Sequence, residues 1–145
     1  MSAPVVPAAG AARARVVGVG VRTFKELIAW QLAAALRDEI VAVTDRPPAA
    51  ADRNYCDQLR GSAASAAANI AEGFARFGAK EFARGLLIAR GELAETENHL
   101  EDGLHRHYLS EADYQHLATL AKRAFVAVSR LHASLRTHIN RRPRR

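Results

Sequence analysis

The stretch QLRGSAASAAANIAEGFAR, residues 58–76, decides the fold that the sequence predicts. Polar side chains recur in it at alternating gaps of four and three residues, the spacing that places side chains on one face of an α-helix. They form a polar stripe of Gln58, Ser62, Ser65, Asn69, Glu72 and Arg76. Beside it lies an apolar stripe of Leu59, Ala63, Ala66, Ile70 and Gly73. Because most other positions are small, neighbouring helices can approach this one closely on more than one side.

The residue types of the polar stripe allow three interpretations. A solvated helix face normally carries more Lys and Glu than Ser and Asn. A hydrogen-bonding seam, between helices or between subunits, would satisfy Asn69 and Glu72 across the contact. A ligand or catalytic site would need a second carboxylate or a histidine near Glu72, which the spacing does not supply. We favour the seam.

The segment before this stretch predicts a helix from Thr23 to about Val43. Thr23 and Glu26 have the spacing of a capping box, in which hydroxyl and carboxylate each bond a free backbone N–H. Apolar residues fall on two sides of this helix, with Ile28, Leu32, Leu36 and Val43 on one side and Leu27, Trp30, Ala34 and Val41 on the other. Such a helix needs two partners. We expect one to be the core and the other a second subunit, with Trp30 among the candidate seam residues.

Pro47 and Pro48 break the chain after the first helix, so the second helix is expected from about Ala50 to between Gly73 and Arg76. A third begins near Gly78, with Glu81 placed to cap it, and has an apolar seam of Phe82, Leu86, Ala89, Leu93, Thr96 and Leu100. Gly85 and Gly91 each cost about 1 kcal/mol relative to Ala in a helix, which suggests close helix contact at both.

A turn follows Gly103, and Ser110 is expected to cap a fourth helix, with Asp113 three residues on. Its core positions are Tyr114, Leu117, Ala121, Ala124, Val128, Leu131, Leu135 and His138. No segment shows sustained strand alternation. The sequence therefore predicts an all-α protein, an antiparallel up-down-up-down four-helix bundle over residues 21–140. Residues 1–20 are expected to be a flexible tail and residues 141–145 a basic tail.

The formal net charge of +6 is unevenly placed, with 21 Lys and Arg against 15 Asp and Glu. Two of the cations lie in the N-terminal tail and four after residue 140, so residues 21–140 hold 15 of each sign. In an up-down bundle, residues 21–30, 66–90 and 125–145 meet at one end. Their charges of +1, +2 and +6 give that end +9, and the opposite end carries −5.

A basic end of this kind can hold a phosphate backbone without reading its sequence. The candidate nucleic-acid contacts are Arg76, Lys80, Arg84, Arg130, Arg136, Arg141, Arg142, Arg144 and Arg145. The other interpretation is that these cations only solvate the last helical turns and favour the helix C-termini.

Several classes of protein are not expected. Cys56, the single cysteine, has no internal disulfide partner, which suits a reducing cytosol, and no evident base to activate it. His99, His105 and His107 lack the paired Glu-x-x-His motifs of metal sites in bundles. No apolar run approaches the roughly 18 to 20 residues that cross a bilayer. We expect a cytoplasmic, non-enzymatic protein with no cofactor, metal or membrane contact.

Four segments carry a family resemblance: FKELIAWQ at residues 24–31, residues 58–74, KEFARGLLIARGELAETENHL at residues 80–100, and Tyr108. Together, over about residues 23–139, they resemble the bacterial four-helix-bundle proteins encoded in intervening sequences of 23S rRNA genes. The string Asn69 to Gly73, NIAEG, is the most specific part. Glu92 and Gly78 depart from the family pattern, which tends to have Ser at both positions.

The resemblance implies a small all-helical bundle that assembles as a homopentamer, without catalytic activity. A more distant resemblance is to the accessory protein of diversity-generating retroelements, a basic pentamer that works with a reverse transcriptase and nucleic acid. We therefore expect an oligomeric binding module whose partner is RNA or DNA, or a reverse transcriptase. The alternative is a protein–protein scaffold or adaptor, favoured if Glu26, Glu72 and Glu81 neutralise the basic end.

Overall fold

The computed structural model describes residues 20–76 and 78–141. The predicted N-terminal tail, apart from Gly20, and the basic residues Arg142, Arg144 and Arg145 lie outside the described residues. Four long helices make up most of the described chain: α2 (Ile28–Thr44), α3 (Arg53–Ala75), α4 (Ala79–His105) and α5 (Glu111–Arg141). Two short 3₁₀ turns, η1 (Phe24–Glu26) and η2 (Ala49–Ala51), precede α2 and α3. No strand occurs within the described ranges.

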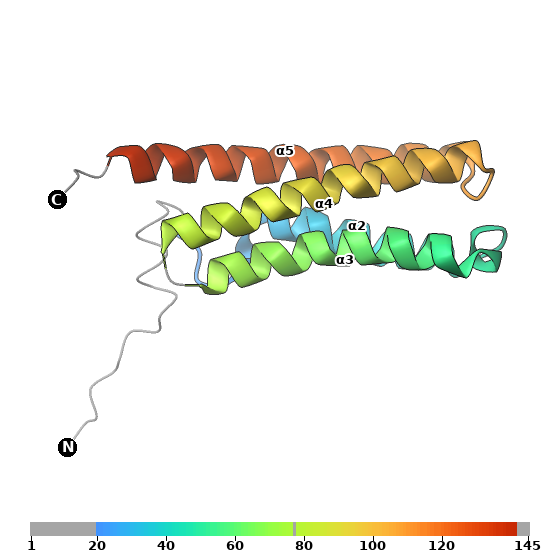
Figure 1. The fold of residues 1–145 in the computed structure, drawn as a ribbon, viewed down its shortest axis with the longest axis horizontal. Coiled ribbons are helices and arrows are strands. Elements are labelled where there is room, and N and C mark those ends of the chain that lie inside the picture. The colour runs from blue at the N-terminus through green and yellow to red at the C-terminus, as the bar shows by residue number, and fades with distance from the viewer. Residues whose placement is uncertain (1–19, 77, 142–145) are drawn as a thin grey trace, which may run out of the picture.

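The four helices run side by side along the long axis of the molecule and alternate in direction (Figure 1). Helix α2 packs on α3 and α5, and α4 packs on α3 and α5, so each helix has two neighbours. This is the predicted up-down-up-down four-helix bundle. Over the described residues no helix is long and apolar enough to span a membrane.

The apolar positions predicted for α3 and α4 form the centre of the core. All five residues of the α3 apolar stripe are buried, and so are all six positions of the α4 seam. In α5, Leu117, Ala121, Ala124, Val128 and Leu135 are buried, whereas Tyr114, Leu131 and His138 are half-buried. The spacing of apolar residues therefore located the core faces of three helices.

The first helix differs from the prediction at its start. Thr23 makes no side-chain cap, and the Glu26 Oε2 atom accepts the N–H of Arg22 at 2.6 Å. The chain makes one 3₁₀ turn, becomes extended at Leu27 (φ −72°, ψ 123°) and enters α2 only at Ile28. The reason is tertiary: Leu27 is 3% exposed, and the extended backbone lets its side chain reach the core.

The core face of α2 also lies elsewhere than predicted. The buried residues are Ala29, Ala33, Ala34, Leu36, Ile40 and Thr44, and most of them lie between the two predicted apolar sides. Ile28 is 69% exposed and Val41 is 38% exposed. Small alanines fill this face because α3 and α5 both pack against it.

The remaining helix ends are close to the predicted ones. Helix α3 begins at Arg53 and is capped by Asp52, whose Oδ1 atom accepts the N–H of Tyr55 at 3.0 Å. The Glu81 carboxylate lies 3.8 Å from Arg76 and accepts no backbone N–H of the described residues at the start of α4, so the expected cap by Glu81 is wrong. Ser110 caps α5 as predicted, since its Oγ atom accepts the N–H of Asp113 at 3.1 Å.

The two glycines predicted to mark close helix contact behave differently. Gly85 lies against the backbone of α3 at Gly73, which confirms the prediction there. Gly91 is exposed and a Cβ atom added to it would meet nothing within 4 Å, so the prediction is wrong at that position.

Candidate functional site

The two ends of the bundle differ in construction. The end of α3, the start of α4 and the end of α5 meet at one end, whereas the α2–α3 and α4–α5 turns form the other (Figure 1). The first is the end for which the sequence predicted positive charge. All six candidate contacts within the described ranges are exposed there or along the adjoining part of α5: Arg76, Lys80, Arg84, Arg130, Arg136 and Arg141.

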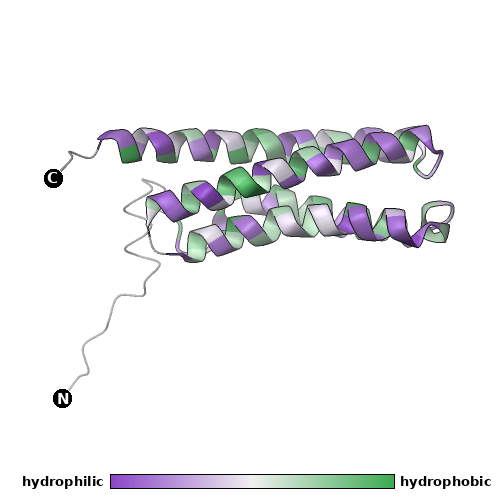
Figure 2. Cartoon of the chain, viewed as in Figure 1, coloured by the Kyte–Doolittle hydropathy of each residue, from purple (hydrophilic) through white to green (hydrophobic). Residues whose placement is uncertain are grey.

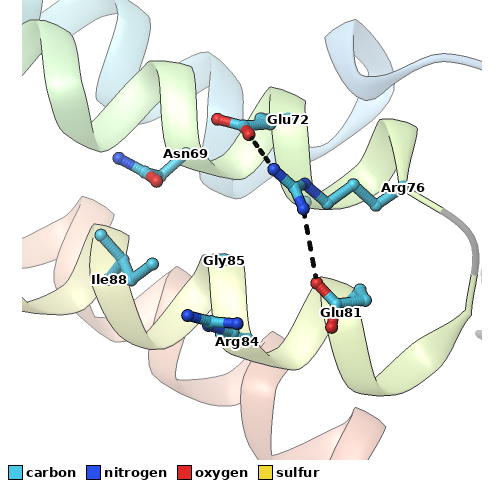
Figure 3. Close-up of a pocket in the computed structure, with 8 residues that line it drawn as sticks. Asn69, Glu72, Arg76, Glu81, Arg84, Gly85 and Ile88 are labelled. Atoms are coloured by element: carbon cyan, nitrogen blue, oxygen red, sulfur yellow. Dashed lines mark hydrogen bonds and ion pairs between the residues drawn. The ribbon is translucent and has the colours of Figure 1, made fainter.

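Arg76 is the one candidate among these six that is held by carboxylates. Its Nη2 atom lies 2.6 Å from Glu72 Oε1, and its Nη1 atom lies 3.8 Å from Glu81 Oε2 (Figure 3). The hydrogen bond to Glu72 raises the pKa of the guanidinium further above its usual range. The other five make no ion pair with the described residues, so their charges remain available to a partner.

Helix α5 has an unusual distribution of charge. Asp113 is the last acidic residue of the chain. From Tyr114 to its end at Arg141, α5 therefore carries only basic charge, on the exposed residues Lys122, Arg123, Arg130, Arg136 and Arg141. Lys122 and Arg123 are missing from the sequence-based candidates, although the absence of acidic residues after Asp113 could have revealed them.

His132 adds little to this charge. Burial lowers the pKa of His132, and the nearby cations Arg136 and Arg90 lower it further. The imidazole of His132 is therefore neutral at physiological pH. No group of three His, Cys, Asp or Glu side chains in the described part of the chain is arranged to hold a metal ion.

The polar stripe of α3 lies along the groove between α3 and α4. Its first part is an interhelical contact, because the Thr96 hydroxyl of α4 donates to Ser62 Oγ at 2.9 Å and both residues are buried. Further along, Asn69 Nδ2 donates to the Ser65 carbonyl at 2.8 Å and to Ser65 Oγ at 3.1 Å, within its own helix. Gln58 is exposed at the start of the stripe.

A small pocket of about 140 Å³ lies where this stripe ends (Figure 3). Its lining residues are Asn69, Glu72, Gly73, Arg76, Glu81, Arg84, Gly85 and Ile88. Two carboxylates and two guanidinium groups balance each other there, so the pocket does not concentrate one sign of charge. Trp30, the remaining seam candidate, lies apart from it, half-buried and edge-on to Phe24 with ring centroids 5.1 Å apart.

The opposite end of the bundle contains a cluster that sequence reasoning missed. Asp52 Oδ2 accepts hydrogen bonds from the Tyr108 hydroxyl at 2.7 Å and from Arg106 Nη2 at 2.8 Å. The bond from Tyr108 is the main reason that the pKa of Asp52 is lowered. Arg106 lies over the ring of Tyr108, 4.6 Å from its centroid, and Tyr55 packs on the same ring. The cluster joins the α2–α3 turn to the α4–α5 turn. Of its residues, only Tyr108 was named from the sequence, as part of the family resemblance.

Cys56 has no catalytic arrangement. Its thiol is buried, with the Sγ atom 3.1 Å from the Ala49 carbonyl oxygen to which it donates, and burial raises its pKa. A raised pKa disfavours the thiolate, which is the nucleophilic form.

The comparison with known families matches this architecture. The sequence matches the family described as 23S rRNA-intervening sequence protein over residues 25–128, more than half of the chain. The chain belongs to this family. The match runs from η1 through α2, α3 and α4 into α5, of which it covers the part up to Val128. No curated protein matches the chain. The more distant resemblance to the retroelement accessory protein stays a prediction.

Proposed function

We propose that this protein is a non-enzymatic binding module of the cytoplasm that associates with RNA or DNA through the basic end of the bundle. It acts as a closed homo-oligomer, with five copies as the resemblance implies. In such an assembly every basic end points the same way, so the positive fields of the copies add over one face. A reverse transcriptase that works on the same nucleic acid is a further candidate partner.

The observation that carries the proposal is the acid-free part of α5. The exposed cations that follow Asp113 have no carboxylate between them and no ion pair to described residues, and three of them, Arg130, Arg136 and Arg141, lie in the half of α5 that reaches the basic end. Cations that only solvate a helix end do not require the absence of every acidic residue from Tyr114 to Arg141. The family description, which refers to an intervening sequence of 23S rRNA, agrees with association with RNA.

The competing proposal is a protein–protein adaptor, which neutralisation of the basic end would favour. Glu72 and Glu81 do hold Arg76, but Glu26 bonds a backbone N–H and pairs with no cation in the described ranges. Only one of the candidate cations is offset in this way. The charge available at this end therefore favours nucleic acid over an adaptor role.

Gel mobility shift with duplex and single-stranded RNA and DNA at two salt concentrations tests the proposal. We expect retention that weakens as salt rises, with the slope of log K against log salt changing by about 0.7 to 0.9 per phosphate contact. The variant Lys80→Gln, Arg84→Gln, Arg136→Gln should weaken binding to all sequences and reduce that slope by about 2 to 3.

The matched control removes the same charge away from the basic end, with Arg37→Gln, Arg46→Gln and Arg53→Gln. It should keep most of the binding and the salt slope. Equal loss in both triple variants would show that net charge alone is responsible. No salt-sensitive retention of any nucleic acid would reject the proposal in favour of the adaptor.

A further inference from the structure

Four of the five exposed large apolar side chains of the described residues form two patches on different faces of the bundle. Ile28 of α2, 69% exposed, and Val126 of α5, 37% exposed, line one groove between these helices, which we call the groove patch. Leu87 and Ile88 of α4, 50% and 43% exposed, form the second, the ridge patch. Figure 2 shows this strongly hydrophobic section in the first half of α4.

The two patches lie at the same level along the bundle axis. Helix α4 ends at His105 and the antiparallel α5 begins at Glu111, so Arg90 and Phe125 lie within about one residue of the same level, in agreement with the contact of the Arg90 guanidinium with the Phe125 ring, 4.9 Å from its centroid. Because α4 and α5 are antiparallel with the same rise per residue, two residues back from Arg90 corresponds to two residues forward from Phe125. Ile88 is therefore level with Ala127, which lines the groove beside Ile28.

Charges near the two patches are complementary at matching levels. Lys122 and Arg123 line the same groove as Val126 and make no ion pair with described residues. By the same register, Glu92 of α4 is level with Arg123. Burial and the neighbouring Glu95 raise the pKa of Glu92, so the two carboxylates lie close together. Neither forms an ion pair with a Lys or Arg of the described residues, and Glu95 pairs with His99.

We infer that the ridge patch of one copy docks on the groove patch of a second copy, with Glu92 and Glu95 facing Lys122 and Arg123. The inference rests on the homo-oligomer proposed above and names its interface. Since two different surfaces meet, the contact is head-to-tail. Since they lie at one level, repetition of the contact adds no translation along the bundle axis, which is the condition for a closed ring instead of a helical filament. All basic ends then point to one side.

The same register also predicts repulsion between two like charges. Arg84 lies nearly level with Arg130, so these like charges approach each other in the docked pair. Arg130→Gln is therefore expected to leave the assembly intact or to tighten it, whereas Arg123→Glu should loosen it. An ordinary contribution of surface cations to solubility would not separate these two positions.

Single aspartates on the most exposed residue of each patch test the contact. Full-length Ile28→Asp and Leu87→Asp are each expected to convert the oligomer into single chains by native mass measurement. Val41→Asp, a change of the same kind at an exposed apolar residue outside both patches, should keep the wild-type mass. Circular dichroism and thermal melting should show all three folded, because none of these side chains is buried.

Mixing the two variants gives a sharper result. The Ile28→Asp chain retains its ridge and the Leu87→Asp chain retains its groove, so together they should form a 1:1 pair that cannot grow. Loss of assembly in only one variant, or no pair on mixing, would overturn the head-to-tail contact. Wild-type mass in both variants would reject this interface while leaving the oligomer standing.

A wild-type protein that remains a single chain would reject the oligomer and the interface together. Retention of nucleic acid is measured separately. If it is absent while the patch variants behave as expected, the nucleic-acid proposal fails and the docking contact stands.

Discussion

Gly85 of α4 and Gly73 of α3 bring two helix backbones into direct contact. A Cβ atom built on Gly85 would lie 2.9 Å from the Gly73 Cα atom and 2.8 Å from the Asn69 carbonyl oxygen. Both neighbours are backbone atoms, which cannot swing away as a flexible side chain can. This contact draws α3 and α4 together beside the pocket shown in Figure 3.

Gly85→Ala should therefore destabilise the protein, although alanine favours helix formation. Overpacking of a tight site costs about 1–3 kcal/mol, more than the gain of about 1 kcal/mol in helix propensity. Gly61→Ala is the control, because a Cβ there meets nothing within 4 Å and should be stabilising. Urea denaturation at one fixed protein concentration measures both. A stabilised Gly85→Ala protein would contradict the close contact.

The side chain of Tyr55 fills the space beside Gly103, so this position has no room for a Cβ atom. The Tyr55 hydroxyl is held there because it donates to the His99 carbonyl at 2.8 Å. A Cβ on Gly103 would lie 1.9 Å from that hydroxyl oxygen and 2.8 Å from the Tyr55 Cζ atom. We expect Gly103→Ala to cost several kcal/mol, roughly 2 to 4. Tyr55→Phe alone should cost about 1 kcal/mol for the lost hydrogen bond.

Combining Tyr55→Phe with Gly103→Ala should cost less than the sum of the two single changes, because the atom in the closest clash has been removed. Partial rescue is expected, since Cζ remains near. The double-mutant cycle is measured by thermal or urea denaturation. Strict additivity would show that Tyr55 does not set the requirement for glycine.

The Asp52 cluster predicts a loss of stability in acid. The pKa of Asp52 in the folded protein is lowered from its ordinary value of 3.8, chiefly by the hydrogen bond from Tyr108. The folded state therefore binds this proton less tightly than the unfolded state. The stabilisation is complete above the ordinary pKa and is lost as pH falls through the lower folded-state value.

Asp52→Asn should reduce stability near neutral pH, and the difference from wild type should shrink as the pH falls below 3.8. Asparagine keeps one acceptor oxygen for the N-cap, and the change removes the charge together with the oxygen that accepts from Tyr108 and Arg106. Asp57→Asn, an exposed carboxylate of the same helix without an ion pair in the described ranges, is the control. Denaturation measurements across this pH range give the stability of both proteins. A stability difference between wild type and Asp52→Asn that does not change with pH would contradict the stabilising role of the cluster.

The buried bond between Thr96 and Ser62 should contribute measurably to helix packing. Thr96→Val keeps the shape and removes the donor, at a cost of about 1 kcal/mol. Thr137→Val removes an exposed hydroxyl that bonds its own helix, and should change stability by less than about 0.5 kcal/mol. Chemical denaturation compares the two, and equal effects would show that the interhelical bond is unimportant.

Local sequence patterns predicted much of the fold and part of the candidate site. The Ser110 cap and the apolar faces of α3 and α4 depend on spacing within one helix, which the sequence displays. The basic end followed from chain direction alone, because antiparallel helices place known residues at known ends. The sequence did not show that Arg76 would be held by Glu81, which belongs to the next helix.

By itself, the sequence determined four helices, their order, the inner faces of three of them and the separation of charge between the two ends. Tertiary structure decided what depends on the position of a neighbouring helix. It placed the inner face of α2 between its two apolar sides, extended the backbone at Leu27, and brought Asp52 to Arg106 across 54 residues of chain. The physical reason is that side-chain periodicity fixes where residues lie around one helix axis, whereas burial depends on which neighbours cover each flank.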